Sequence, residues 1–168
     1  MIENLALVVF PALMLFAAFS DLLTMTIPNR VSILLVSFYF LIALYFHTPL
    51  ATLGEHVSCG LAVLVLTFIF FQFNWVGGGD AKLAAATALW LGWDNLLDYG
   101  LISSLAGGAL TLAVLQLRSD SAPQRLLSVG FIHRLAQKNA GVPYGIALAF
   151  AGLLIYPETI FWTGVAGV

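Results

Sequence analysis

Two aspartates combine a reactive side chain with an unusual position. Asp21 lies near the end of the first apolar segment, and Asp80 closes the glycine run in residues 76–80, Val-Gly-Gly-Gly-Asp. The chain is 61% hydrophobic and only 8% charged, so both acids are expected at or within a bilayer. Carboxylates are costly at that depth, and intramembrane acids usually mark a functional site. We therefore interpret Asp21 and Asp80 as a catalytic pair.

Two carboxyl groups that meet share one proton near neutral pH, which leaves one base and one acid. The base can take a proton from water while the acid protonates an amide carbonyl oxygen, without a metal or covalent intermediate. The glycines at 77–79 are expected to adopt unusual backbone conformations and to let an extended peptide approach the main chain. Lys82, two residues after Asp80, is expected to tune that carboxyl group. The predicted chemistry is peptide hydrolysis.

A purely structural interpretation of the same residues stays open at this point. Asp21 could cap a helix end or extend its carboxylate toward the interface, and Asp80 could be a helix N-cap at a glycine turn. Both roles are common for aspartate. Spacing and burial alone do not separate these roles from catalysis.

The composition sets the fold class. A mean hydropathy of +1.02 over 168 residues exceeds what a water-soluble core and polar surface could balance, which indicates an integral membrane protein. We predict an all-α, polytopic membrane protein with a single domain, residues 1–168, and no soluble part. The six candidate transmembrane helices are residues 5–23, 31–46, 57–73, 81–93, 99–117 and 143–156.

Two of these segments are too short to cross a bilayer. Residues 81–93 and 143–156 each cover roughly 20 Å of a roughly 30 Å hydrocarbon layer. The triple glycine precedes the first of them, and Gly141-Val142-Pro143 leads into the second. Irregular backbone at membrane depth is tolerated where it lines a wet cavity. We therefore expect both helices to begin below the surface, around a sunken site.

The basic residues predict the orientation, because they occupy only alternate connections: Arg30, Lys82, Arg118, Arg125, Arg134 and Lys138. By the positive-inside rule these connections face the cytoplasm and both termini lie outside. Acids collect on the other face: Glu3, Glu55, Asp94, Asp98 and Glu158. The first segment lacks a basic leading region, so we expect a retained helix and not a cleaved signal. The basic residues form no dense run, which argues against nucleic-acid binding.

The cysteine and histidine residues of the sequence give little support for a metal site or a disulfide bond. Cys59 is the only cysteine, so no intramolecular disulfide can form, and it is expected to be a small core residue. His47, His56 and His133 share no helical spacing. We predict no metal site and no cofactor.

Three sequence blocks resemble a known family. They are Phe-Ser-Asp at 19–21 with Ile-Pro-Asn at 27–29, Gly-Gly-Gly-Asp-Ala-Lys-Leu at 77–83, and Val-Pro-Tyr-Gly-Ile-Ala at 142–147. In this order they resemble the type IV prepilin peptidases, membrane aspartyl proteases with a G-x-G-D motif. The resemblance implies that Asp21 and Asp80 are the catalytic aspartates. It also implies that the following residues support the site or bind substrate: Pro28, Asn29, Gly77, Gly78, Gly79, Lys82, Pro143 and Tyr144.

The chain departs from the larger members of that family, which carry a cytoplasmic methyltransferase insert with paired cysteines. No such insert occurs here, so N-methylation is not expected. The chain resembles instead the short peptidases of tight-adherence, Flp-type pili. The resemblance implies a multi-pass protein of the bacterial inner membrane, open to the cytoplasm. Its substrates would be prepilins with a short basic leader, a glycine before the scissile bond and a hydrophobic helix after it. The native prepilin and the oligomeric state stay open.

Two other functions use the same residues differently. A small proton- or cation-coupled transporter could employ both carboxylates as a relay, although the segments show no evident inverted repeat. A non-enzymatic scaffold subunit would leave the two acids unexplained. Outside the site, small residues on the fifth segment, including Gly107 and Gly108, predict a packing face. Residues 125–135 could form an interfacial helix, and the tail after Pro157 could extend the last helix or lie at the interface.

Overall fold

The computed structural model describes residues 2–119, 130–137 and 141–166, and this part of the chain contains helices and no strands. The helices are α1 (Ile2–Thr24), α2 (Asn29–Tyr45), α3 (Leu50–Gln72), α4 (Gly78–Leu91), α5 (Leu96–Leu117), α7 (Gly130–Ala136), α8 (Tyr144–Ile155), the short 3-10 helix η1 (Tyr156–Glu158) and α9 (Ile160–Ala166). All six predicted apolar segments are helical, which confirms the all-α prediction.

Among the described residues, three helices are long and apolar enough to cross a membrane: Leu7–Thr24, Leu50–Gln72 and Leu96–Leu117. The apolar segments Asn29–Tyr45 and Tyr144–Glu158 are shorter. Helices α4 and α8 contain 14 and 12 residues, so neither reaches across a roughly 30 Å hydrocarbon layer at about 1.5 Å per residue. The chain is therefore a membrane protein of long and short helices, and the number of spans and the side of each terminus stay predictions.

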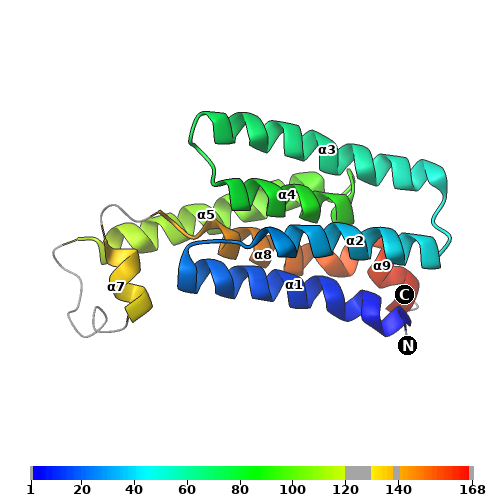
Figure 1. Ribbon diagram of the computed structural model, residues 1–168, viewed down its shortest axis with the longest axis horizontal. Helices are drawn as coiled ribbons and strands as arrows, with labels where there is room; N and C mark the ends of the chain where they lie inside the picture. Colours follow the sequence, from blue (N-terminus) through cyan, green and yellow to red (C-terminus); the bar gives the residue numbers. More distant parts are fainter. Residues whose placement is uncertain (1, 120–129, 138–140, 167–168) are drawn as a thin grey trace.

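Helices α1 to α5 and α8 lie side by side along one direction, with consecutive long helices antiparallel, whereas α7 crosses this direction (Figure 1). Helices α1 to α4 are each followed by a residue in the left-handed region, which ends the helix: Met25, His47, Asn74 and Gly92, with φ of 56°, 50°, 58° and 72°. The end of α1, the start of α2, the end of α3 and the starts of α4 and α8 meet at one end of the bundle (Figure 1). We call it the carboxylate end, because both aspartates lie there.

Helix α4 is the centre of the bundle and packs against α2, α3 and α8. From Ala81 to Leu91 every side chain except that of Lys82 is buried. Helix α3 packs mainly against α4, and Gly60 permits the approach. A Cβ at Gly60 would lie 3.1 Å from the Cβ of Leu89 and 3.3 Å from the carbonyl oxygen of Ala85. The short α4 is thus held in place by longer helices around it.

A cluster of aromatic side chains fixes the opposite end of the bundle. Trp90 is fully buried, and its Nε1 donates a hydrogen bond to the Leu35 carbonyl oxygen at 3.0 Å. The rings of Phe10 and Tyr156 stack with centroids 4.4 Å apart. His56 joins α3 to α4, because its Nδ1 lies 3.0 Å from the Leu89 carbonyl oxygen. This packing connects α1, α2, α3, α4 and η1 away from the aspartates.

The predicted interfacial helix at residues 125–135 and the tail after Pro157 differ in how the structure describes them. Of the predicted interfacial helix 125–135, residues 125–129 lie outside the described residues, and α7 begins at Gly130. The tail does not simply continue α8: η1 at Tyr156–Glu158 interrupts it, and α9 then packs against α1. Helix α9 therefore lies near the start of α1 (Figure 1).

Candidate active site

Asp21 lies in the last turn of α1 and is buried, with 5% of its surface exposed. Its Oδ2 accepts a hydrogen bond of 2.7 Å from the backbone N–H of Gly145, in the first turn of α8. Free amides at a helix N-terminus favour a negative charge, so α8 both holds and stabilises this carboxylate. Asp21 therefore has a fixed position, set by a residue far away in the sequence.

Gly145 is needed for this contact. A Cβ at this position would lie 2.8 Å from Oδ2 of Asp21 and 2.6 Å from Cδ1 of Ile27. Both distances are shorter than any normal Cβ contact. Gly145 lies inside the third sequence block that resembles the family, but it was not among the predicted site residues. The feature that could have identified Gly145 as a site residue is its position directly after Pro143 and Tyr144, at the start of a helix.

Asp80 lies in the first turn of α4 and is partly buried. Its side chain lies against Gly77, the N-cap residue of α4. A Cβ at Gly77 would lie only 2.8 Å from Oδ2 of Asp80. An acid in this position of a helix is favoured by the unpaired amides of the first turn.

The triple glycine differs from the prediction in one respect. Gly77 has φ −69° and ψ 144°, which any residue can adopt, and Gly78 and Gly79 belong to α4. The expectation of unusual backbone conformations is therefore wrong. Neighbouring side chains leave little room for a larger residue at two of these positions. A Cβ at Gly78 would lie 3.3 Å from the Phe71 ring, and a Cβ at Gly79 would lie 3.2 Å from Cβ of Ile27.

Both aspartates line one cavity of about 790 Å³ at the carboxylate end. Its walls come from the ends of α1 and α3, the starts of α4 and α8, and the connection between α3 and α4. The lining residues are Asp21, Met25, Thr67, Phe71, Asn74, Trp75, Val76, Gly77, Asp80, Ala84, Gly141, Val142, Tyr144 and Leu148. The lining is mostly apolar around the two carboxylates, which suits a site that holds a hydrophobic chain next to reactive acids.

Tyr144, a predicted site residue, lines this cavity and packs on α5. A Cβ at Gly107 would lie 2.4 Å from Cε1 of its ring and 3.0 Å from Cζ. The small residue at 107 therefore receives the tyrosine ring. Pro143 is the N-cap of α8 and Pro28 is the N-cap of α2, so both fix where a helix begins.

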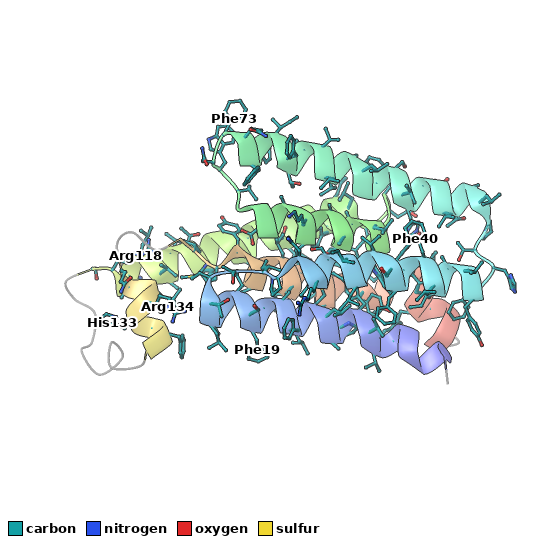
Figure 2. All side chains as sticks on the ribbon, viewed as in Figure 1. Phe19, Phe40, Phe73, Arg118, His133 and Arg134 are labelled. Carbon is teal, nitrogen blue, oxygen red and sulfur yellow. The ribbon has the colours of Figure 1, made fainter. Side chains whose placement is uncertain are left out.

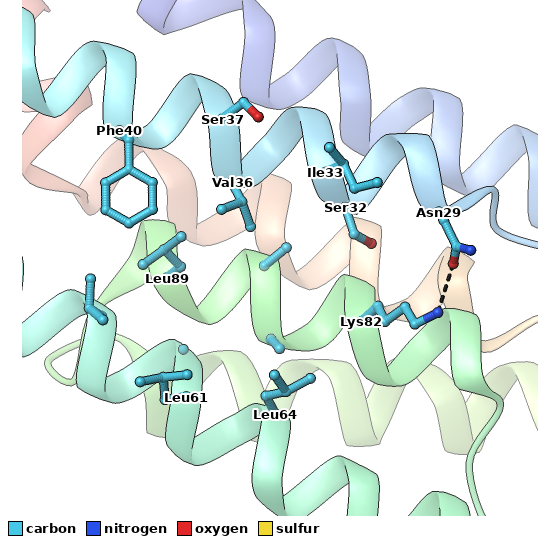
Figure 3. A pocket seen from close by; sticks show the side chains of 14 residues that line it. Asn29, Ser32, Ile33, Val36, Ser37, Phe40, Leu61, Leu64, Lys82 and Leu89 are labelled. Atoms are coloured by element: carbon cyan, nitrogen blue, oxygen red, sulfur yellow. Dashed lines mark hydrogen bonds between the residues drawn. The ribbon is translucent and has the colours of Figure 1, made fainter.

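Lys82 and Asn29 lie apart from this cavity. Two residues along a helix correspond to a rotation of roughly 200°, so Lys82 leaves α4 on the side opposite Asp80. Its Nζ donates a hydrogen bond of 2.8 Å to Oδ1 of Asn29 (Figure 3). Both residues line a second hollow between α2 and α3. The structure therefore brings together Asp21, Asp80, Gly77 and Tyr144 in the cavity, and it groups Lys82 with Asn29 elsewhere.

Two arginines at the carboxylate end donate hydrogen bonds to backbone carbonyl oxygens of other segments. Arg118 donates from Nε to the Leu135 carbonyl oxygen at 3.0 Å and from Nη2 to the Gly141 carbonyl oxygen at 2.9 Å. Arg134 donates from Nη1 to the Leu23 carbonyl oxygen. Figure 2 shows both arginines at the end where α5 and α7 meet. Within the described residues, no three His, Cys, Asp or Glu side chains are arranged to hold a metal ion.

Residues 8–112, more than half of the chain, match the model of the type IV leader peptidase family. The chain belongs to this family. The matched range contains Asp21 and Asp80 and ends before Pro143 and Tyr144. The resemblance inferred from the sequence blocks is thereby confirmed at the level of the family.

Curated relatives agree with this assignment. The chain is 32% identical over 113 residues to the prepilin leader peptidase/N-methyltransferase of Aeromonas hydrophila, and 31% identical over 113 residues to that of Aeromonas salmonicida strain A449. Each match covers 60% of this chain and 33% of the relative. The chain therefore spans about a third of the length of these relatives. No solved structure matches the chain.

Proposed function

We propose that this protein is a membrane aspartyl endopeptidase that removes the short basic leader from type IV prepilins of the Flp-like kind. The single observation that carries the proposal is that Asp21 of α1 and Asp80 of α4 line one cavity. Family membership supports the peptidase class and the prepilin substrate. The proposal gives this chain the cleavage step and not N-methylation.

In the proposed mechanism one carboxylate takes a proton from a water molecule, and the water oxygen attacks the scissile carbonyl carbon. The other carboxyl group donates its proton to the carbonyl oxygen, which gives a neutral tetrahedral diol. Proton transfer to the amide nitrogen then breaks the C–N bond. The products are the leader's carboxylate and the new amino terminus of the pilin. Each carboxyl group returns to its starting state: the base passes the proton taken from water to the amide nitrogen, and the acid regains a proton from a hydroxyl group of the diol as the C–N bond breaks.

We further propose that the cavity opens to the cytoplasm in the inner membrane. Four basic residues of the described part support this orientation, because they lie at the carboxylate end: Arg30, Lys82, Arg118 and Arg134. Positive charge near membrane helices marks the cytoplasmic side. A leader that stays in the cytoplasm then brings its junction to the depth of Asp21 and Asp80.

The test is to co-express the chain with a short-leader pilin precursor and to follow the precursor's size on a gel. Wild type should cleave, and Asp21→Asn and Asp80→Asn should each lose about 10²-fold or more of the rate. Asp98→Asn is the matched control, since Asp98 lies in the first turn of α5 at the other end of the bundle.

Cleavage that survives substitution of either aspartate in the cavity would refute the paired mechanism. If all forms insert and none cleaves, a transporter that uses the same carboxylates becomes the better explanation.

A further inference from the structure

A groove of about 570 Å³ lies on the side of α4 opposite the candidate active site. Its walls are α2 and α3 and its floor is α4 (Figure 3). None of its 14 lining residues lines the active-site cavity. The two hollows are therefore separate, and the groove requires its own explanation.

The groove is apolar along its length. Ile33, Val36 and Phe40 of α2 face Leu61 and Leu64 of α3. Small residues also line it, namely Gly60, Ala85 and Ala86. In a membrane protein, a hollow between two apolar helices fills with the hydrocarbon chains around it or with an apolar partner.

The groove has the length of one membrane leaflet. Its lining positions on α2 run from Asn29 to Phe40, a rise of roughly 16 Å at about 1.5 Å per residue. The hydrocarbon layer is roughly 30 Å thick, so the groove ends near its middle. An acyl chain of one leaflet fits this length, whereas a membrane-spanning helix would extend beyond the end of the groove.

The end of the groove at the carboxylate end carries a positive charge. Lys82 is exposed, and its Nζ uses one of three N–H donors in the bond to Oδ1 of Asn29. The Nδ2 group of Asn29 brings two further donors, and Ser32 adds a hydroxyl group one turn deeper (Figure 3). None of the lining residues is acidic. These donors match a phosphate group and the ester oxygens next to it.

We propose that the groove binds an anionic phospholipid, with an acyl chain between α2 and α3 and the headgroup phosphate at Lys82 and Asn29. Basic pockets between transmembrane helices are known to hold anionic headgroups in this way. With the orientation proposed above, the lipid belongs to the cytoplasmic leaflet. Binding does not depend on peptidase activity, so either proposal can fail without the other.

The test uses the full chain in phosphatidylcholine bilayer discs that contain a minor fraction of phosphatidylglycerol with a photoreactive acyl chain. After irradiation, mass spectrometry locates the cross-links. We expect them at groove residues such as Val36, Leu61 and Leu64. Lys82→Gln should lower their yield about fivefold, the effect of one lysine at an anionic surface. Arg30→Gln is the matched control, because Arg30 follows Asn29 but does not line the groove.

A second variant tests the apolar part of the groove. Val36→Trp fills it from the wall and should remove the cross-links at Leu61 and Leu64 while Lys82 is retained. A photoreactive phosphatidylcholine probe with equal yield would overturn the proposal, as would equal effects of Lys82→Gln and Arg30→Gln. Loss of the cross-links on addition of a pilin precursor would also overturn it, since the groove would then hold the substrate.

Discussion

The two hollows on either side of α4 differ in charge and in what surrounds them. The cavity holds two carboxylates from α1 and α4, and α8 also contributes to its wall, whereas the groove holds one ammonium group and lies between α2 and α3. Asp80 and Lys82 are two residues apart, and helix geometry alone sends them to opposite sides. A short helix can therefore separate opposite charges that would otherwise pair and neutralise each other.

The two sides also differ in how closely the chain is packed. Around the cavity, two glycines allow contacts that a larger residue would disrupt, Gly145 against Asp21 and Gly107 against Tyr144, and Gly79 packs closely on Ile27. The groove is more open, although Gly60 in its lining also packs closely, with a Cβ there only 3.1 Å from Cβ of Leu89. We interpret the tight side as the part that positions reacting groups, since catalysis tolerates little displacement.

Gly79→Val should give the largest effect among these contacts. A Cβ at this position already lies 3.2 Å from Cβ of Ile27 and 3.4 Å from its carbonyl oxygen. The two further methyl groups of valine would force α4 away from the connection that follows α1. We expect cleavage to fall by more than about 10²-fold, because Asp80 moves with α4.

The measurement is the gel assay of pilin precursor cleavage, with insertion checked on the same membranes. Gly79→Ala gives an intermediate step, since Ile27 would need to move by only a few tenths of an ångström. Wild-type activity in Gly79→Val would remove the close-packing argument for this side of α4.

Gly145→Ala should come next, with a loss of about 10²-fold. The new methyl group would meet Oδ2 of Asp21 at 2.8 Å, so the carboxylate would have to leave the Gly145 amide that holds it. Gly100→Ala is a suitable control in another helix start, because nothing lies within 4 Å of a Cβ there. Equal rates for both variants would show that the Gly145 contact does not position Asp21.

How far the sequence predicts this site depends on the range of each interaction. The apolar segments were predictable because hydrophobicity acts over whole helices, and the two aspartates stood out because little else there is charged. The bond between Asp21 and Gly145 was not predictable, since it joins residues 124 positions apart. The separation of Lys82 from Asp80 was available from helix geometry, but closeness in sequence was given more weight.

Gly107→Ala compares two neighbouring glycines of α5. A Cβ at Gly107 would lie 2.4 Å from the ring of Tyr144, whereas nothing lies within 4 Å of one at Gly108. Displacing this ring should alter the cavity wall without moving either aspartate, so we expect a loss of about tenfold, smaller than for Gly145→Ala.

The rate of precursor cleavage, measured over a range of precursor concentrations, checks this expectation. The change should appear mainly in KM, because Tyr144 lines the cavity and carries no proposed proton-transfer role. Gly108→Ala should cleave like wild type. Equal losses in the two variants would indicate a general effect on α5 packing.

Lys82→Met should have the smallest effect on cleavage. If Lys82 acts on the other side of α4, its loss changes the groove and reaches Asp80 only through the shared helix. We expect a reduction of a few-fold, far below that of Asp80→Asn, because a charge on the opposite face of a helix contributes little to the reacting groups. Single-turnover cleavage with excess enzyme provides the measurement, since it isolates the chemical step. A loss as large as that of Asp80→Asn would make Lys82 a full partner of the carboxylates, and the two hollows would then be one functional unit.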